Sequence, residues 1–144
     1  MVNLKVNFGG LSMKNQITTA SGTFGYGEEY SQFYDLSRLG GMILKGTSVE
    51  PRLGNKGYRI AETPAGMLNS VGLQNPGVHY AVEHYLPWLQ QFDVAKIANI
   101  VGYEAEDYAQ VVSICLLYTS ENAHKAGADI AVLEHALKLV ADKR

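Results

Sequence analysis

The chain has 144 residues, 47% of them hydrophobic, and its 12 basic and 14 acidic residues give a formal net charge of -2. These values predict one globular domain, or part of one, with a real core. A nucleic-acid-binding face is excluded because basic residues do not cluster. The single cysteine, Cys115, excludes an internal disulfide and a zinc site of the usual Cys/His spacing. With no long apolar segment and no signal peptide, we expect a cytoplasmic protein without a membrane span.

The first predicted element is a β-hairpin, because residues 4–8 and 11–13 alternate apolar and polar around Gly9-Gly10. Residues 16–20 predict a first strand, and a glycine-containing loop and a helix over 28–39 follow it. Residues 42–45 predict a second strand, buried on both faces and ending at a functional rim. The connection over residues 46–75 is too long for a plain loop, so we expect it to be functional or partly structured.

Asn75 and Pro76 predict the N-cap and first turn of the next helix, which Pro87 should kink or interrupt. Residues 95–102 predict a third strand, residues 104–127 a helix, and residues 130–133 a fourth strand. A hairpin followed by four β-α units favours a parallel α/β sheet, either open and doubly wound or the first half of an eight-stranded barrel. The spacing of Gly22, Gly25 and Gly27 is not that of a dinucleotide fingerprint, so nothing supports the open form.

Candidate ligand-binding residues lie at the carboxyl ends of the predicted strands, where α/β folds bind ligands. They are Ala20, Ser21, Lys45, Gly46 and Asn99. Lys45 suits a negatively charged ligand, or else forms a structural ion pair with Glu62. Ser21 either contacts a ring-edge amide or caps a turn. Asn99 either binds the amide edge of a heterocycle or bonds the backbone of a neighbouring loop.

The run over residues 66–77 contains glycines and asparagines whose backbone N–H groups could surround a planar anion, or it is a surface turn. No Ser/His/Asp arrangement is readable, and His79 and His84 are expected to face solvent. The aromatic residues around the first helix are expected to be packing residues, and Cys115 a buried core thiol. Those aromatic residues are Tyr26, Tyr30 and Phe33.

These motifs resemble class 1B dihydroorotate dehydrogenase, the catalytic chain of the NAD-linked bacterial enzyme. The resemblance covers residues 3–112, and its densest parts are residues 20–30, 44–48, 51–55, 59–77 and 97–102. The Thr-Phe-Gly-Tyr-Gly loop over residues 23–27 and the Lys-Gly-Thr segment over residues 45–47 favour class 1B over the other classes. An unrelated small α/β domain is the remaining interpretation.

The resemblance implies a TIM barrel that holds FMN and oxidises (S)-dihydroorotate to orotate in pyrimidine biosynthesis. Ala20, Ser21, Gly46 and Asn99 would bind the flavin. Lys45 would be catalytic, touching flavin and substrate and stabilising negative charge on the reduced ring. The substrate-binding residues would be Asn69, Ser70, Val71, Gly72 and Leu73. A subunit with FAD and an iron-sulfur cluster would pass the electrons to NAD.

The sequence departs from the family after the third predicted strand. The family's Asn-x-Ser-Cys-Pro-Asn motif, whose cysteine removes the substrate proton, does not follow residues 130–133, and Cys115 lies in a helix and cannot replace it. We therefore expect residues 1–144 to be the N-terminal half of a barrel, with an anomalous, non-native tail over about 113–144. The alternative function is an inactive half-barrel that keeps part of the flavin and orotate surface or only self-associates as a homo-oligomer.

Overall fold

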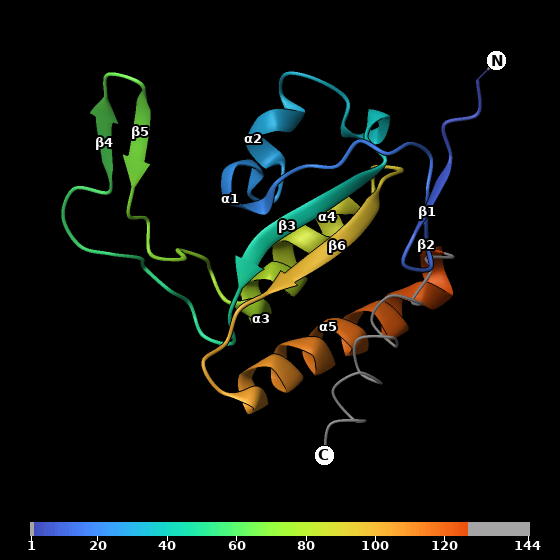
Figure 1. The fold of residues 1–144 in the computed structure, drawn as a ribbon. Coiled ribbons are helices and arrows are strands. Elements are labelled where there is room, and N and C mark those ends of the chain that lie inside the picture. Colours follow the sequence, from blue (N-terminus) through green and yellow to red (C-terminus); the bar gives the residue numbers. More distant parts are fainter. Residues whose placement is uncertain (1, 127–144) are drawn as a thin grey trace.

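The computed structural model describes residues 2–126, with side chains described up to residue 117. The predicted N-terminal hairpin is confirmed as β1 (Val6–Phe8) and β2 (Leu11–Met13), an antiparallel pair that lies beside the rest of the molecule (Figure 1). The two strands that carry the predicted ligand residues are β3 (Gly41–Thr47) and β6 (Ala95–Ile100). They pair in parallel, with a register irregularity between Ile43 and Gly46.

The strand predicted over residues 16–20 is reduced to one parallel bridge, from Thr18 to Gly41 at the start of β3. Ile17 is 58% exposed, so burial does not hold this segment as a full strand. Thr18 therefore lies beside β3, and β3 lies beside β6. Within residues 2–126 the strands form three two-stranded sheets and no closed barrel, and the fourth predicted strand lies outside the described residues.

The helix predicted over residues 28–39 is wrong in its extent. Within this range the structure has α2 (Glu28–Ser31) and a 3₁₀ turn (Leu36–Arg38), and a short helix, α1 (Ser21–Phe24), lies in the predicted loop before it. α2 ends at Ser31, and Asp35 then caps the separate 3₁₀ turn: its backbone is extended and its side chain accepts a hydrogen bond from the Ser37 N–H, 2.9 Å away. Asp favours such caps over helix interiors. Phe33 is also 81% exposed, so it is not the packing residue that we expected.

The next helical stretch begins at Val78, later than Asn75-Pro76 predicted. It consists of α3 (Val78–Tyr80), a π-helical segment (Ala81–Tyr85) and α4 (Leu86–Leu89). Pro87 lies in the first turn of α4, directly after the π-helical segment. Proline has no N–H to donate, and the widened π-helical turn before it lets the helical path continue. The interruption predicted at Pro87 is therefore a widened turn and not a break.

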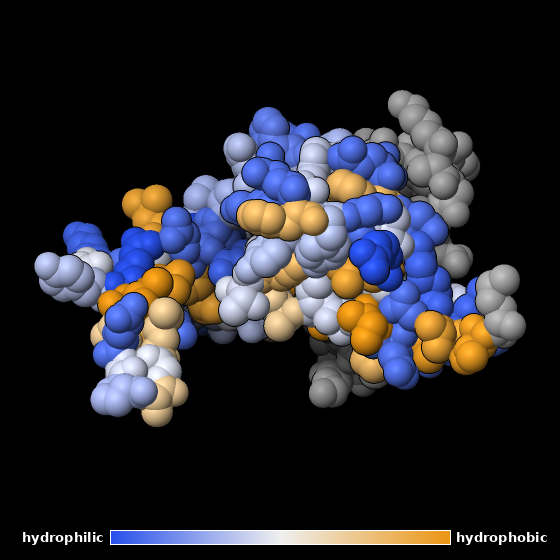
Figure 2. All heavy atoms as spheres, turned by 90° about the horizontal axis from the view of Figure 1, so that it is seen from above, coloured by the Kyte–Doolittle hydropathy of each residue, from blue (hydrophilic) through white to orange (hydrophobic). Residues whose placement is uncertain are grey.

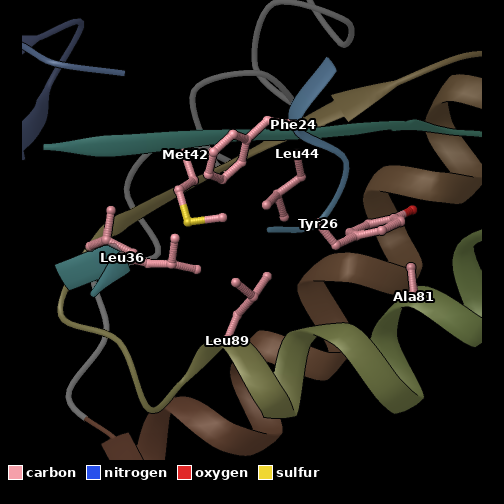
Figure 3. Close-up of a cluster of buried hydrophobic side chains, with 8 residues drawn as sticks. Phe24, Tyr26, Leu36, Met42, Leu44, Ala81 and Leu89 are labelled. Carbon is pink, nitrogen blue, oxygen red and sulfur yellow. The ribbon is translucent and has the colours of Figure 1, made fainter. Parts of the chain in front are cut away.

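The main hydrophobic core lies between β3 and the helical stretch that ends with α4 (Figure 3). Met42 and Leu44 of β3 point toward Leu36 and Leu89 there, and Phe24 and Tyr26 close the same cluster. Fully burying one such side chain contributes about 2 kcal/mol. This face of β3 is therefore covered by the core, so a ligand can contact β3 only at its end or on its other face.

The long connection over residues 46–75 contains a second hairpin, β4 (Ile60–Thr63) and β5 (Gly66–Asn69), which projects from the body of the molecule (Figure 1). Every residue of both strands is exposed. Figure 2 shows hydrophobic as well as hydrophilic residues along this arm, and Ile60, Met67 and Leu68 are the large hydrophobic ones in its strands.

The helix predicted over residues 104–127 is confirmed as α5 (Ala105–Ala126), which follows β6. Val111 of α5 packs with Val78 and Val82 in a second small core. None of the helices described up to residue 126 is both long and apolar enough to cross a membrane.

Candidate functional site

Three of the predicted flavin residues converge at the carboxyl end of the parallel pair. Gly46 of β3 lies in register with Asn99 of β6, and the Asn99 side-chain amide donates a hydrogen bond to Ser21 Oγ over 2.8 Å. Ser21 opens α1, directly after Ala20. The turn-capping alternative for Ser21 and the loop-backbone alternative for Asn99 are therefore replaced by a contact between the two side chains.

Gly46 has no room for a side chain at this point. A Cβ atom there would lie 2.9 Å from Val101 Cγ2 and 3.5 Å from Asn99 Nδ2. Any larger residue would push the Val101 side chain away, whereas its contact with Asn99 would be an ordinary one. The glycine thus lets β3 and β6 approach closely where the predicted ligand residues meet.

Lys45 is held through its backbone carbonyl. Thr47 Oγ1 donates a hydrogen bond to the Lys45 carbonyl over 2.8 Å, and this uses the only proton of that hydroxyl. The buried Tyr26 O–H must therefore be the donor in its 2.7 Å bond to Thr47 Oγ1. Burial raises the pKa of Tyr26 to about 12, so the phenol keeps its donor proton over the physiological range.

The side chain of Lys45 is half-buried, and the structure contradicts the ion-pair alternative with Glu62. In the part of the chain that is described, the one ion pair joins Lys14 to Asp93, at the opposite end of the sheet. An ammonium group at the end of a strand without a carboxylate partner is suited to a ligand's negative charge.

The predicted substrate residues form a loop, residues 69–73, that begins at the last residue of β5. Neighbouring chain segments hold it: the Ser70 N–H donates to the Arg59 carbonyl over 2.7 Å, and the Asn55 N–H donates to the Val71 carbonyl over 3.0 Å. Gly72 has a φ of 80°, and a Cβ atom there would lie 2.6 Å from the Asn55 backbone nitrogen. This path therefore requires glycine.

The predicted flavin residues and the predicted substrate loop are joined by Ser48 and Asn75, a role that the sequence reasoning missed. Asn75, buried with 5% exposure, bonds both Ser48, just after β3, and the Leu73 carbonyl. Its position before proline suggested a helix N-cap. Instead its Oδ1 accepts from the Gly77 N–H over 2.9 Å, an Asx-turn, for which the same residue pair is an equally good signal.

Two cavities lie near the parallel strands, and neither is a ready-made flavin pocket. One of about 400 Å³ lies near the amino end of β3, lined by residues such as Ile17, Tyr34 and Leu39. Another, of about 90 Å³, lies between the β3–β6 pair and the helices, and Lys45 and Asn99 are among its lining residues. It is smaller than a typical ligand site. Within residues 2–126 the predicted ligand residues therefore share no enclosed pocket: Lys45 and Asn99 border the small cavity, whereas Ala20 and Asn69 are exposed.

Exposure tests the predictions for two histidines and the cysteine. His79 and His84 are exposed, as expected. Cys115 is half-buried against the second core, and burial raises the pKa of its thiol to about 11. It is therefore a packing thiol and not a base. A search of the described residues finds no cluster of His, Cys, Asp and Glu side chains that could hold a metal ion.

The chemistry of the converging groups suits the polar edge of a flavin ring. Ser21 offers a hydroxyl and Asn99 an amide that carries both a donor and an acceptor beyond its bond to Ser21. Lys45 adds a cation beside them, and Gly46 leaves its backbone without a covering side chain. The residues present therefore fit the ring edge of FMN.

Comparison with known proteins identifies the family. The model of the dihydroorotate dehydrogenase family matches residues 3–121. The chain is 57% identical over 111 residues to the "Dihydroorotate dehydrogenase B (NAD(+)), catalytic subunit" of Geobacillus sp. (strain WCH70), covering 77% of this chain and 36% of that protein. The protein of the same name from Bacillus thuringiensis (strain Al Hakam) is 56% identical over the same shares. The chain thus spans about a third of the length of these relatives.

A solved structure agrees on the fold. The dihydroorotate dehydrogenase of Eimeria tenella, in complex with ferulenol, superposes with a TM-score of 0.64 at 18% identity, covering 81% of this chain and 34% of that one. The described α/β arrangement is accordingly part of the TIM-barrel type of fold. With the family model matching most of the sequence, the chain belongs to the dihydroorotate dehydrogenase family.

Proposed function

We propose that this chain supplies the N-terminal flavin and substrate surfaces of an FMN-dependent enzyme that oxidises (S)-dihydroorotate to orotate in pyrimidine biosynthesis. The observation that carries the proposal is the convergence of Ser21, Gly46 and Asn99 beside Lys45, in a chain 57% identical to a catalytic subunit of that name. The flavin residues in this proposal are Ala20, Ser21, Lys45, Gly46 and Asn99. The substrate residues are Lys45, Asn69, Ser70, Val71, Gly72 and Leu73.

The chain's own groups have distinct tasks in this reaction. FMN supplies the hydride acceptor. Lys45 would place a positive charge beside the flavin ring, where it would stabilise negative charge. The Tyr26–Thr47 chain holds the Lys45 backbone carbonyl. Asn99, oriented by Ser21, hydrogen-bonds the ring edge. The loop over residues 69–73 binds the pyrimidine ring of the substrate through the Asn69 amide. It binds the carboxylate of the substrate through backbone N–H groups.

The partners in this proposal follow the names of the relatives. A catalytic subunit of the NAD(+) type implies a second, electron-transfer subunit, which we propose carries FAD and an iron-sulfur cluster. We further propose a cytoplasmic location and a homo-oligomeric state. The exposed Ile60, Met67 and Leu68 of the β4–β5 hairpin support self-association, because large apolar side chains gathered on one arm favour contact with another surface.

The test is ligand binding by the 144-residue chain. Titration of FMN into the chain, followed by quenching of flavin fluorescence, should give saturable binding, and orotate should then shift the visible spectrum of the bound flavin. Lys45→Ala should weaken both, because it removes the cation from the site. The matched control is Lys56→Ala, at an exposed position in the long connection. Equal behaviour of the two variants would contradict the role of Lys45.

A second candidate is a non-catalytic module that only self-associates. It is favoured by the absence, within residues 2–126, of any strand paired to the outer edge of β6. Light scattering with and without FMN separates the two functions. An oligomer that binds no flavin supports the module, whereas flavin bound in proportion to protein supports the enzyme surface. Dihydroorotate-dependent bleaching of the flavin would decide for catalysis.

A further inference from the structure

We infer that Asn75 is a positioning residue that fixes the substrate loop, residues 69–73, by fastening it to the carboxyl end of β3. The inference rests on the proposed function, because it explains what holds the substrate loop in the conformation that binds the substrate. Asn75 itself is set back from the loop and buried, so it acts through the backbone of its neighbours and not on the substrate.

All four hydrogen-bonding positions of the Asn75 amide are used. Its Oδ1 accepts from the Ser48 N–H at 3.1 Å and from the Gly77 N–H at 2.9 Å. Ser48 Oγ is 2.7 Å from the Glu50 carbonyl, which takes its single proton, so the hydroxyl oxygen accepts from Asn75 Nδ2 at 3.0 Å. The second N–H of Nδ2 donates to the Leu73 carbonyl at 2.9 Å. Only asparagine offers two acceptors and two donors in this arrangement.

The bond to Leu73 falls at the strained point of the loop. Leu73 is the one non-glycine residue among those described with a positive φ, at 54°. An L-residue with a side chain is disfavoured in this left-handed region, so the surrounding contacts must hold Leu73 there. The Asn75 amide does so directly, and the orientation of the neighbouring backbone N–H groups at Gly72 and Leu73 depends on that conformation.

The same residue connects the loop to the part of β3 that carries Lys45. Ser48 directly follows β3, and its carbonyl accepts from the Val78 N–H at 2.8 Å. Arg52 and Asn75 exchange two backbone hydrogen bonds, of 2.8 and 3.0 Å. The side chain of Asn75 thus completes a rigid junction between the end of β3 and the residues that follow the loop.

The test compares Asn75→Asp with wild type. The substitution keeps the size and both acceptors but replaces the two donors with a carboxylate oxygen, which repels the Leu73 carbonyl. Orotate affinity should fall by about tenfold or more, whereas FMN affinity should stay within about twofold. Ser48→Ala, which removes one bond to Asn75, is a milder variant expected to weaken orotate binding by about threefold. The matched control is Asn7→Asp, exposed in the first hairpin, where the acceptor for the Gly10 N–H is kept.

The outcomes separate the inference from the proposed function. Selective loss of orotate affinity in both variants supports the positioning role. Unchanged orotate affinity overturns it, as does an equal loss of orotate and FMN affinity, which would mean a general structural role. If the wild type binds no orotate, the proposed function fails. Amide hydrogen exchange then decides on the junction, since Asn75→Asp should speed exchange over residues 70–77 and leave β3 and β6 protected, and an unchanged pattern refutes it.

Discussion

Tyr26→Phe tests the buried hydrogen-bond chain that ends at the Lys45 carbonyl. The wild-type phenol donates to Thr47 Oγ1 over 2.7 Å, and Thr47 donates onward to Lys45 over 2.8 Å. The substitution removes one buried hydrogen bond and leaves the Thr47 oxygen with one partner fewer. The free energy of unfolding at pH 8 should therefore fall by about 1 kcal/mol.

At alkaline pH the Tyr26 phenol lowers the free energy of unfolding instead of raising it. Burial raises the pKa of Tyr26 from 10.0 to about 12. The contribution of Tyr26 to the free energy of unfolding is fully present below pH 10, which is the pKa of its phenol in the unfolded chain. It is lost as the pH rises toward 12, because the phenol then ionises in the unfolded chain but not in the folded one. Linkage gives a loss of about 1.4 kcal/mol at pH 11, which Tyr26→Phe avoids. The stabilities of wild type and variant should therefore converge near pH 11.

Urea unfolding followed by the fluorescence of Trp88, the single tryptophan, measures both effects in one experiment. Wild type, Tyr26→Phe and the control Tyr58→Phe are compared at pH 8, 10 and 11. Tyr58 is fully exposed, so its substitution should leave the stability at pH 8 unchanged. Wild-type and Tyr26→Phe stabilities that stay a constant distance apart from pH 8 to 11 would refute the assignment of the buried donor.

Three further predictions concern packing and titration. Leu89→Ala removes a side chain with 0% exposure and should lower the free energy of unfolding by about 2 to 5 kcal/mol in urea, and a loss below about 1 kcal/mol would contradict the core. Burial holds the pKa of Cys115 at about 11, so its reaction with a disulfide reagent at pH 8 should be about a hundredfold slower than in the urea-unfolded chain, and equal rates would count against burial. Hydrogen bonding to Lys14 lowers the pKa of Asp93 below its ordinary 3.8, so its stabilisation is present above that pH and is lost on further acidification. Asp93→Asn should flatten this part of the acid unfolding profile, and an unchanged profile would exclude the pair as its source.

The elements that sequence reasoning predicted well are those with continuous apolar runs. β3 and β6 were expected over residues 42–45 and 95–102 because they read as buried parallel strands, and α5 was expected nearly at its observed bounds. The pairing of Ser21 with Asn99 joins residues distant in the chain. Their common location at strand ends was predictable, but their mutual hydrogen bond was not.

The errors arise where a side chain serves local geometry instead of periodicity. The β4–β5 hairpin was not predicted because all of its residues are exposed, so no apolar alternation marks it. The prediction of one helix over 28–39 was too long because α2 ends at Ser31 and Asp35 caps a separate 3₁₀ turn. Asn75 was misassigned because capping a helix and closing an Asx-turn call for the same residue type.

The closed junction between Ser48, Arg52 and Asn75 has a consequence for evolution. The backbone bonds between Arg52 and Asn75 fix the two ends of the segment that carries the β4–β5 hairpin. The length of that hairpin can therefore change by insertion or deletion at its tip without moving the parallel strands, because the entropy of closing the longer segment grows only slowly. A change of length at the tip between Thr63 and Gly66 would thus leave the carboxyl ends of β3 and β6 in place.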